Sequence, residues 1–182
     1  MTHWTVSDIP SQRGRTAVVT GTGGLGFQDA LALARAGANV IIAGRNPSKG
    51  AAAVDQIRQS VPGANVTFGA LDLASLESIE SFGERLRSSR DSLDLLINNA
   101  AVMAPPKRQV TCDGFELQFG TNYLGHFALT AQLLPLLRKG NKRAWSAFQA
   151  SPLEAARSTS MICKLSAATG RCRFTANRNS LA

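Results

Sequence analysis

Cysteine, tyrosine and long apolar runs are scarce in this chain of 182 residues. Its three cysteines form no CxxC pair, so neither a metal site nor a disulfide framework is predicted, and scattered free thiols are typical of the reducing cytoplasm. The first fifteen residues hold no apolar stretch, and no later segment has the roughly 20 apolar residues of a membrane-spanning helix. We therefore expect a cytoplasmic protein without a membrane span, comprising one domain or most of a larger one.

Acidic residues are rare near the C-terminus, and this rarity accounts for most of the net charge of +8. Residues 1–142 hold 14 Lys and Arg against 11 Asp and Glu, whereas residues 143–182 hold 6 against Glu154 alone. The basic excess lies in a tail with no aromatic stacking pattern and no recognisable reading helix, so nucleic acid is not predicted as a partner.

The N-terminal part contains a complete strand–helix–strand unit of the kind that binds dinucleotides. Gly21, Gly23 and Gly26 form GxGxxG at the first turn, where missing side chains let backbone N–H groups approach a pyrophosphate. A lone GxGxxG also occurs in plain turns, but this one is flanked by the expected elements. The predicted strand, helix and strand are Thr16–Thr20, Gly24–Ala36 and Asn39–Ala43.

Strands and helices continue to alternate after this unit. The pattern predicts a helix capped by Ser48, a helix opened by Ser75, and a long helix with many apolar residues. The further predicted elements are 48–60 (helix), 65–70 (strand), a helix from 75, 93–97 (strand) and 113–139 (helix). Such alternation predicts an α/β fold with a doubly wound, Rossmann-like parallel sheet, truncated after about four strands.

Five motifs then carry a family resemblance over residues 12–142: TGTGGLG, AGRN, LDL, NNA and TNYLGHF. On these motifs the chain resembles the short-chain dehydrogenase/reductase family, in particular the branch with retinol dehydrogenases and protochlorophyllide reductases. The resemblance implies an NAD(P)-dependent oxidoreductase that interconverts a small apolar alcohol and a carbonyl. Two departures stand out, since the first loop is one residue shorter than the family's TGxxxGxG, and Ala101 replaces a usual glycine.

The resemblance also implies a set of cofactor-binding residues on the loops after the strands. Arg45 stands just past the second strand, where NAD binders commonly place an acid, and a guanidinium there suits the 2′-phosphate of NADP. NADP is therefore predicted over NAD, although Arg45 could also be a solvated loop cation. Asp72 is implied to hold the adenine, or else it only ends its strand or caps the next helix. The implied set is Gly21, Thr22, Gly23, Gly24, Leu25, Gly26, Arg45, Asn46, Asp72, Leu73, Asn99 and Ala100.

The catalytic residues of the family are missing. A tyrosine, a lysine four residues later and an upstream serine perform its chemistry, but the only tyrosine is Tyr123, and no YxxxK occurs. Ser160 and Lys164 have the spacing without the phenol, which we interpret as accidental. Of the catalytic group, Asn122 alone remains, with the implied role of holding a water that relays protons to the lysine. His126 is interpreted as structural.

Residues 143–182 do not look like the family. They contain no valine and one isoleucine, where the family has a valine-rich fifth strand. We interpret residues 1–142 as an incomplete NAD(P)-binding domain and 143–182 as a disordered, non-family tail.

A shifted reading frame explains that tail. Back-translated and read one base earlier, AWSAFQASP becomes GVVSVSSLA, ARSTSMICK becomes GAIDFDDLQ, and the last segment becomes QAERRYRPMPVYSQSKLA, which contains YxxxK. The alternative is a genuine C-terminus of different sequence. The chain as written is therefore predicted to be an inactive dinucleotide-binding fragment, with a regulatory NADP-binding protein or an unstable pseudogene product as alternatives.

Overall fold

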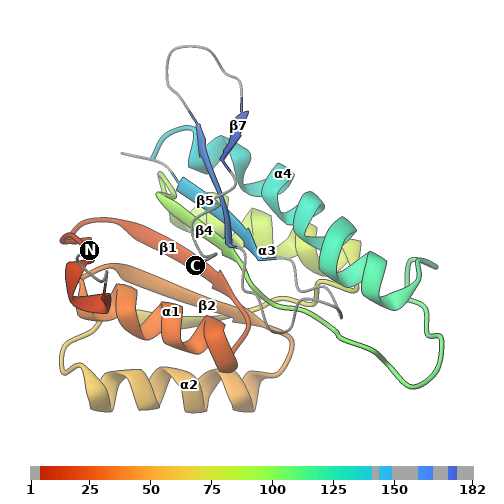
Figure 1. Ribbon diagram of the computed structural model, residues 1–182, viewed down its shortest axis with the longest axis horizontal. Helices are drawn as coiled ribbons and strands as arrows, with labels where there is room; N and C mark the ends of the chain where they lie inside the picture. The colour runs from red at the N-terminus through yellow and green to blue at the C-terminus, as the bar shows by residue number, and fades with distance from the viewer. Residues whose placement is uncertain (1–4, 141–143, 149–159, 166–171, 176–182) are drawn as a thin grey trace, which may run out of the picture.

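The computed structural model describes residues 5–140, 144–148, 160–165 and 172–175. One sheet runs through this part of the chain in the order β3-β2-β1-β4-β5-β6-β7 (Figure 1). The first four strands are parallel to one another, as the alternating pattern predicts. Their bounds are β1 Thr16–Thr20, β2 Asn39–Gly44, β3 Val66–Ala70 and β4 Leu95–Asn98.

Helices cover both faces of this sheet and bury the alternate side chains of its strands. Val18 of β1 packs in a cluster with residues of α3 and α4, whereas Ala17 and Val19 pack with residues of α1 and α2. The doubly wound, Rossmann-like fold is therefore confirmed. The helices are the short 3₁₀ turn η1 Val6–Asp8, then α1 Gly24–Arg35, α2 Pro47–Ser60, α3 Leu76–Ser89, the π-helix η2 Phe119–Gly125 and α4 His126–Leu137.

The alternation of strands and helices continues through α4 to a strand β5 (Ala144–Phe148), which lies parallel to β4. The strands β6 (Ser160–Leu165) and β7 (Cys172–Thr175) then run antiparallel, with no helix between the last three strands among the described residues. The sheet edge that the first four strands alone would leave at β4 is therefore occupied by β5. Backbone groups of an unpaired strand edge accept almost any sequence, so β5 can pair there despite its lack of valine.

The start of α2 differs from the prediction, whereas that of α3 agrees with it. Asn46, not Ser48, caps α2, because its Oδ1 accepts a hydrogen bond from the backbone N–H of Lys49 at 3.0 Å. Pro47 explains the shift, since proline favours the first helical position and keeps the preceding residue extended. Ser75 caps α3 as predicted, and its hydroxyl accepts from the N–H of Ser78.

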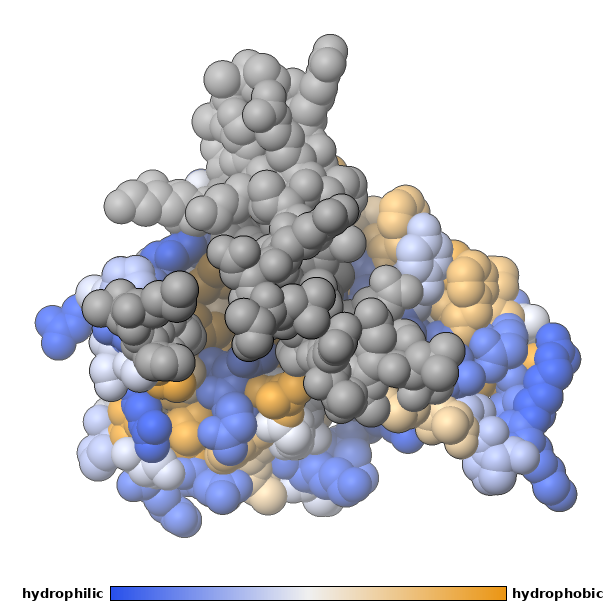
Figure 2. Space-filling view, in the orientation of Figure 1, coloured by the Kyte–Doolittle hydropathy of each residue, from blue (hydrophilic) through white to orange (hydrophobic). Residues whose placement is uncertain are grey.

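The predicted long helix begins later than residue 113 and contains a π-helical turn. The carboxylate of Glu116 accepts hydrogen bonds from the backbone N–H groups of Gln118 and Phe119, which lower the pKa of Glu116 and cap the helix there. Apolar surface gathers over α4 on the face shown in Figure 2. Among the residues of this helix, Phe127 is 68% exposed. Within the described residues, no helix combines the length and apolarity needed to span a bilayer.

Candidate dinucleotide-binding site

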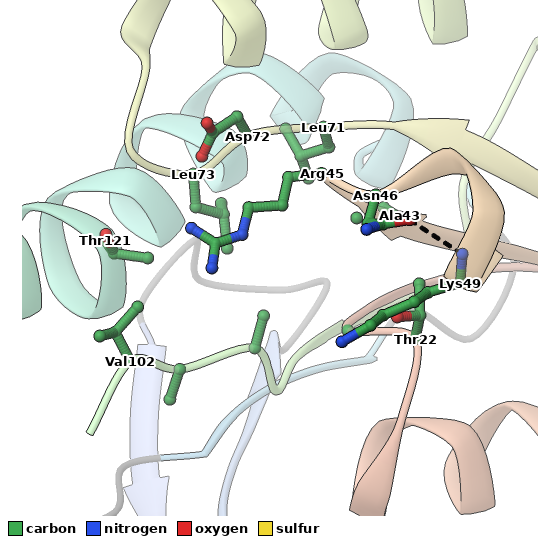
Figure 3. A pocket seen from close by; sticks show the side chains of 14 residues that line it. Thr22, Ala43, Arg45, Asn46, Lys49, Leu71, Asp72, Leu73, Val102 and Thr121 are labelled. Carbon is green, nitrogen blue, oxygen red and sulfur yellow. Dashed lines mark hydrogen bonds between the residues drawn. The ribbon is translucent and has the colours of Figure 1, made fainter. Parts of the chain in front are cut away.

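A cavity of about 290 Å³ lies at the carboxyl ends of β1–β4, where the order of the strands reverses. In doubly wound sheets this edge is the usual place for a ligand. Figure 3 shows side chains from several loops converging on it. Its lining comprises Gly21, Thr22, Ala43, Gly44, Arg45, Asn46, Lys49, Leu71, Asp72, Leu73, Ala100, Ala101, Val102 and Thr121.

The glycine turn after β1 forms one wall. Gly21 (φ +101°) and Gly24 (φ +57°) adopt the left-handed conformation that favours glycine. A Cβ at Gly21 would lie 2.8 Å from the side-chain nitrogen of Asn99, and one at Gly26 would overlap the same atom. Nothing described lies within 4 Å of a Cβ at Gly23 or Gly24, so this part of the turn faces open space. The shortened loop therefore still leaves room for a phosphate at the start of α1.

Asn99 holds the glycine turn against β4 and does not line the cavity. Its Nδ2 donates to the carbonyl oxygen of Thr20 at 3.0 Å, and its backbone N–H donates to the Thr20 hydroxyl at 2.8 Å. The N–H of Ala100 donates to the same hydroxyl at 3.0 Å. Thr20 was missed by the sequence analysis, although a threonine directly before GxGxxG is a visible signal.

Two cations extend into the cavity after β2. The side chain of Arg45 extends across it, and the ammonium group of Lys49 reaches it from the first turn of α2 (Figure 3). Lys49 was also missed. The signal was available, because a lysine in the first turn of a helix opposes the helix dipole and suggests a bound anion. Asn46 lines the cavity too, and its side chain caps α2.

Asp72 lies in the cavity lining and also takes part in the turn before α3, so its role toward the adenine stays a prediction. Its carboxylate lines the cavity, and its Oδ1 also accepts from the N–H of Ala74 at 2.9 Å, in the turn before α3. Leu71 and Leu73 flank it and lie against the same cavity. The loop after β3 thus offers one carboxylate between two apolar side chains.

Asn122 lies beside the cavity and clamps a loop. Its Oδ1 accepts from the N–H of Val102 and its Nδ2 donates to the carbonyl oxygen of Val102, both at 2.8 Å. Both ends of this amide are therefore engaged, and the predicted water relay stays a prediction. Its neighbour Thr121 lines the cavity with a buried hydroxyl that has no hydrogen-bond partner among the described residues.

The structure brings most of the predicted cofactor residues to one cavity. Those in its lining are Gly21, Thr22, Arg45, Asn46, Asp72, Leu73 and Ala100, while Gly23, Gly24, Leu25, Gly26 and Asn99 are not among the lining residues. Tyr123 is 59% exposed and stacks on Phe119 with ring centroids 5.4 Å apart, and it is not a lining residue either. Ser160 and Lys164 both lie on β6. Among the described residues, no group of three or more His, Cys, Asp or Glu could hold a metal ion.

The sequence profile of the short chain dehydrogenase family matches residues 15–144. The chain belongs to this family. Among curated relatives of this short-chain dehydrogenase, human polyprenol dehydrogenase is 45% identical over 140 residues, which are 76% of the chain and 42% of the relative. Human retinol dehydrogenase 13 is 48% identical over 126 residues, or 69% of the chain and 38% of the relative. The chain thus spans about 40% of the length of these relatives, and the match to the branch with retinol dehydrogenases is confirmed.

Solved structures agree with the fold. A protein from Mycobacterium paratuberculosis superposes with a TM-score of 0.66 at 46% identity, covering 74% of this chain and 47% of that one. A short chain dehydrogenase from Escherichia coli CFT073 complexed with NADPH superposes with a TM-score of 0.64 at 30% identity, covering 75% and 60%. The shared part thus comprises about three quarters of this chain.

Proposed function

We propose that this short-chain dehydrogenase binds NADP in the cavity at the carboxyl ends of β1–β4. The observation that carries the proposal is the pair of cations, Arg45 and Lys49, in a cavity that also presents the Asp72 carboxylate. A guanidinium and an ammonium group together favour a dianionic 2′-phosphate over free ribose hydroxyls.

The remaining residues fit the other parts of NADP. The open turn at Gly23 and Gly24 and the N-terminus of α1 suit the pyrophosphate, and Asp72 with Leu73 and Ala100 suits the adenosine. Bound NADP supplies hydride transfer in this family, and the chain's residues described above bind and orient it.

We further propose that the chain as written does not catalyse alcohol–carbonyl interconversion. Its sequence contains a single tyrosine, followed four residues later by Phe127 instead of lysine. Without a positioned acid–base group the loss is on the order of 10²–10⁴ in rate. A non-catalytic, regulatory NADP-binding role is the second candidate, because the binding elements persist while YxxxK is absent. We also propose the cytoplasm as the compartment, because scattered cysteines are typical of a reducing environment.

We attribute the missing chemistry to a frameshift near residue 143. The family profile ends at residue 144, where family-like sequence also stops. The proposed boundary at 142/143 lies outside the described residues, as do 149–159, 166–171 and 176–182 of the tail that the sequence predicts to be disordered.

Two titrations test the proposal. NADPH added to purified protein should bind saturably and more tightly than NADH, while retinol or polyprenol with NADP, and retinal with NADPH, should give no turnover above a buffer control. The absence of NADPH binding to folded protein would contradict the cofactor assignment. Turnover at rates typical of the family would contradict the predicted inactivity.

A further inference from the structure

The buried imidazole of His126 connects Thr20 and Asn122, the two residues that hold the segment 99–102 beside the cavity. His126 begins α4 and is 7% exposed, with its Nε2 3.0 Å from the Thr20 hydroxyl of β1 and its Nδ1 2.9 Å from the carbonyl oxygen of Asn122. These two partners are 102 residues apart in sequence. The ring therefore links the end of β1 to the π-helix η2.

The partners determine which ring nitrogen carries the proton. A carbonyl oxygen can only accept, so Nδ1 must be protonated to bond with Asn122. In the neutral ring Nε2 is then a bare acceptor, and the Thr20 hydroxyl must donate to it. Burial lowers the pKa of His126, which agrees with a neutral ring, although the bond to Asn122 opposes that shift.

The Thr20 hydroxyl is suited to this single orientation. Its oxygen already accepts the N–H groups of Asn99 and Ala100, at 2.8 and 3.0 Å. Its one proton is therefore left for a further acceptor, and Nε2 of His126 at 3.0 Å is closer than the carbonyl oxygen of Ile97 at 3.3 Å. A neutral imidazole at this place aims the lone pairs of Thr20 at the two backbone N–H groups.

The other ring nitrogen supports the far end of the same loop. Nδ1 holds the backbone of Asn122, and the Asn122 side chain holds both backbone groups of Val102. Ala100 and Val102 both line the cavity. The His126 ring thus supports one end of the segment 99–102 through Thr20 and the other end through Asn122.

We propose that His126 is a positioning residue for cofactor binding, acting through Thr20 and Asn122 to hold the segment 99–102 against the cavity. The inference rests on the proposed NADP site and adds a residue that does not itself line it. In this arrangement the histidine donates to a carbonyl, accepts from a hydroxyl and touches no cofactor.

Substitutions at the two ends of the Thr20–His126 bond test the proposal. His126→Phe keeps the ring size without either hydrogen bond, and Thr20→Val keeps the shape without the hydroxyl. Each should raise the Kd for NADPH roughly 3- to 10-fold, the range for a neutral hydrogen bond, and the double variant should lose less than the product of the two effects. Thr20→Ser, which retains the hydroxyl, should stay within about twofold of wild type. Ile57→Val, at a buried position in the core cluster that contributes no residue to the cavity lining, is the matched control for simple destabilisation.

A second measurement is independent of the cofactor. The chain has only two histidines, so a His3→Gln background leaves His126 as the sole imidazole in ¹⁵N spectra. These should show the Nδ1–H tautomer, and amide exchange at Asn99, Ala100 and Val102 should accelerate in His126→Phe but not in Ile57→Val. If wild type fails to bind NADPH, the proposed function is wrong while the tautomer and exchange data still decide this inference. An Nε2–H tautomer, unchanged exchange, or unchanged NADPH affinity in His126→Phe would each overturn it.

Discussion

At the residue scale, the proposed preference for NADP rests on two positive charges at the end of β2. Arg45 and Lys49 extend into the same cavity from the loop after this strand and from the first turn of α2. A dianionic group such as the 2′-phosphate of the proposed NADP could pair with both cations.

Replacing Arg45 by aspartate should therefore reverse the cofactor preference. Charge-assisted bonds to a phosphate contribute roughly 10- to 100-fold in affinity, and an acid repels the phosphate while it accepts from ribose hydroxyls. Isothermal titration with NADPH and NADH measures both affinities. Lys49→Gln is the companion variant and should weaken NADPH alone; equal affinities for both nucleotides in wild type would show that Arg45 is a bystander.

The buried imidazole of His126 should also make the free energy of unfolding depend on pH. Burial holds the pKa of His126 below its usual value of about 6.5. As the pH falls below about 6.5, the unfolded chain binds the proton first, so the free energy of unfolding should fall by up to about 1.4 kcal/mol per pH unit until the folded-state pKa is reached. Urea unfolding between pH 7.5 and 5 in a His3→Gln background measures this. His126→Phe should remove that part of the slope, and an unchanged slope would contradict the assignment.

At the element scale, the glycine turn illustrates how one motif serves two purposes. Gly26 lacks a side chain because the Asn99 amide occupies that space, whereas Gly23 borders open space. Gly26 is thus required by the fold, and we expect Gly23 to matter for nucleotide binding.

Alanine substitutions should separate the two purposes. Gly26→Ala displaces the Asn99 amide and should lower the free energy of unfolding by roughly 1–3 kcal/mol. Gly23 has an extended φ of −147°, and nothing described lies within 4 Å of a Cβ placed there. Gly23→Ala should therefore change the free energy of unfolding little, while the affinity for NADPH falls. Thermal unfolding and NADPH titration of both variants decide this. Equal loss of stability in the two would mean that the turn has no such division.

At the scale of the whole molecule, a long family-like part is followed by a short tail of different sequence. Residues 15–144 match the family, and the sheet continues beyond β4 through β5, β6 and β7. The antiparallel strands β6 and β7 depart from the parallel pattern of β1–β5. This departure begins beyond the residues that match the family.

Restoring the reading frame near residue 143 should therefore produce an active enzyme. The restored segment contains GVVSVSSLA and YSQSK, which supply the serine, tyrosine and lysine that the chain lacks. NADP-dependent oxidation of retinol should appear in the repaired protein and not in the chain as written. The coding DNA is the simplest check, since stop codons or a peptide without YxxxK in the shifted frame would end this explanation.

Local signals in the sequence determined the strand–helix–strand unit, the glycine turn and the family. Strand and helix periodicity and the turn glycines depend on near neighbours, so the first four strands and about half of the cavity lining could be predicted. The caps show the limit of this reasoning, because Pro47 moved the start of α2 to Asn46 although Ser48 was also suitable.

Only the tertiary structure decided which distant groups meet. His126 contacts Thr20 across 106 residues of sequence, and the Asn122 side chain accepts a hydrogen bond from the backbone of Val102. Lys49 lines the same cavity as Arg45. The pairing of β5 with β4 was not predictable from side chains, because backbone groups at an open edge pair with little regard for sequence. Periodicity encodes which face of an element is buried, whereas contacts between loops depend on how the sheet brings the ends of its strands together.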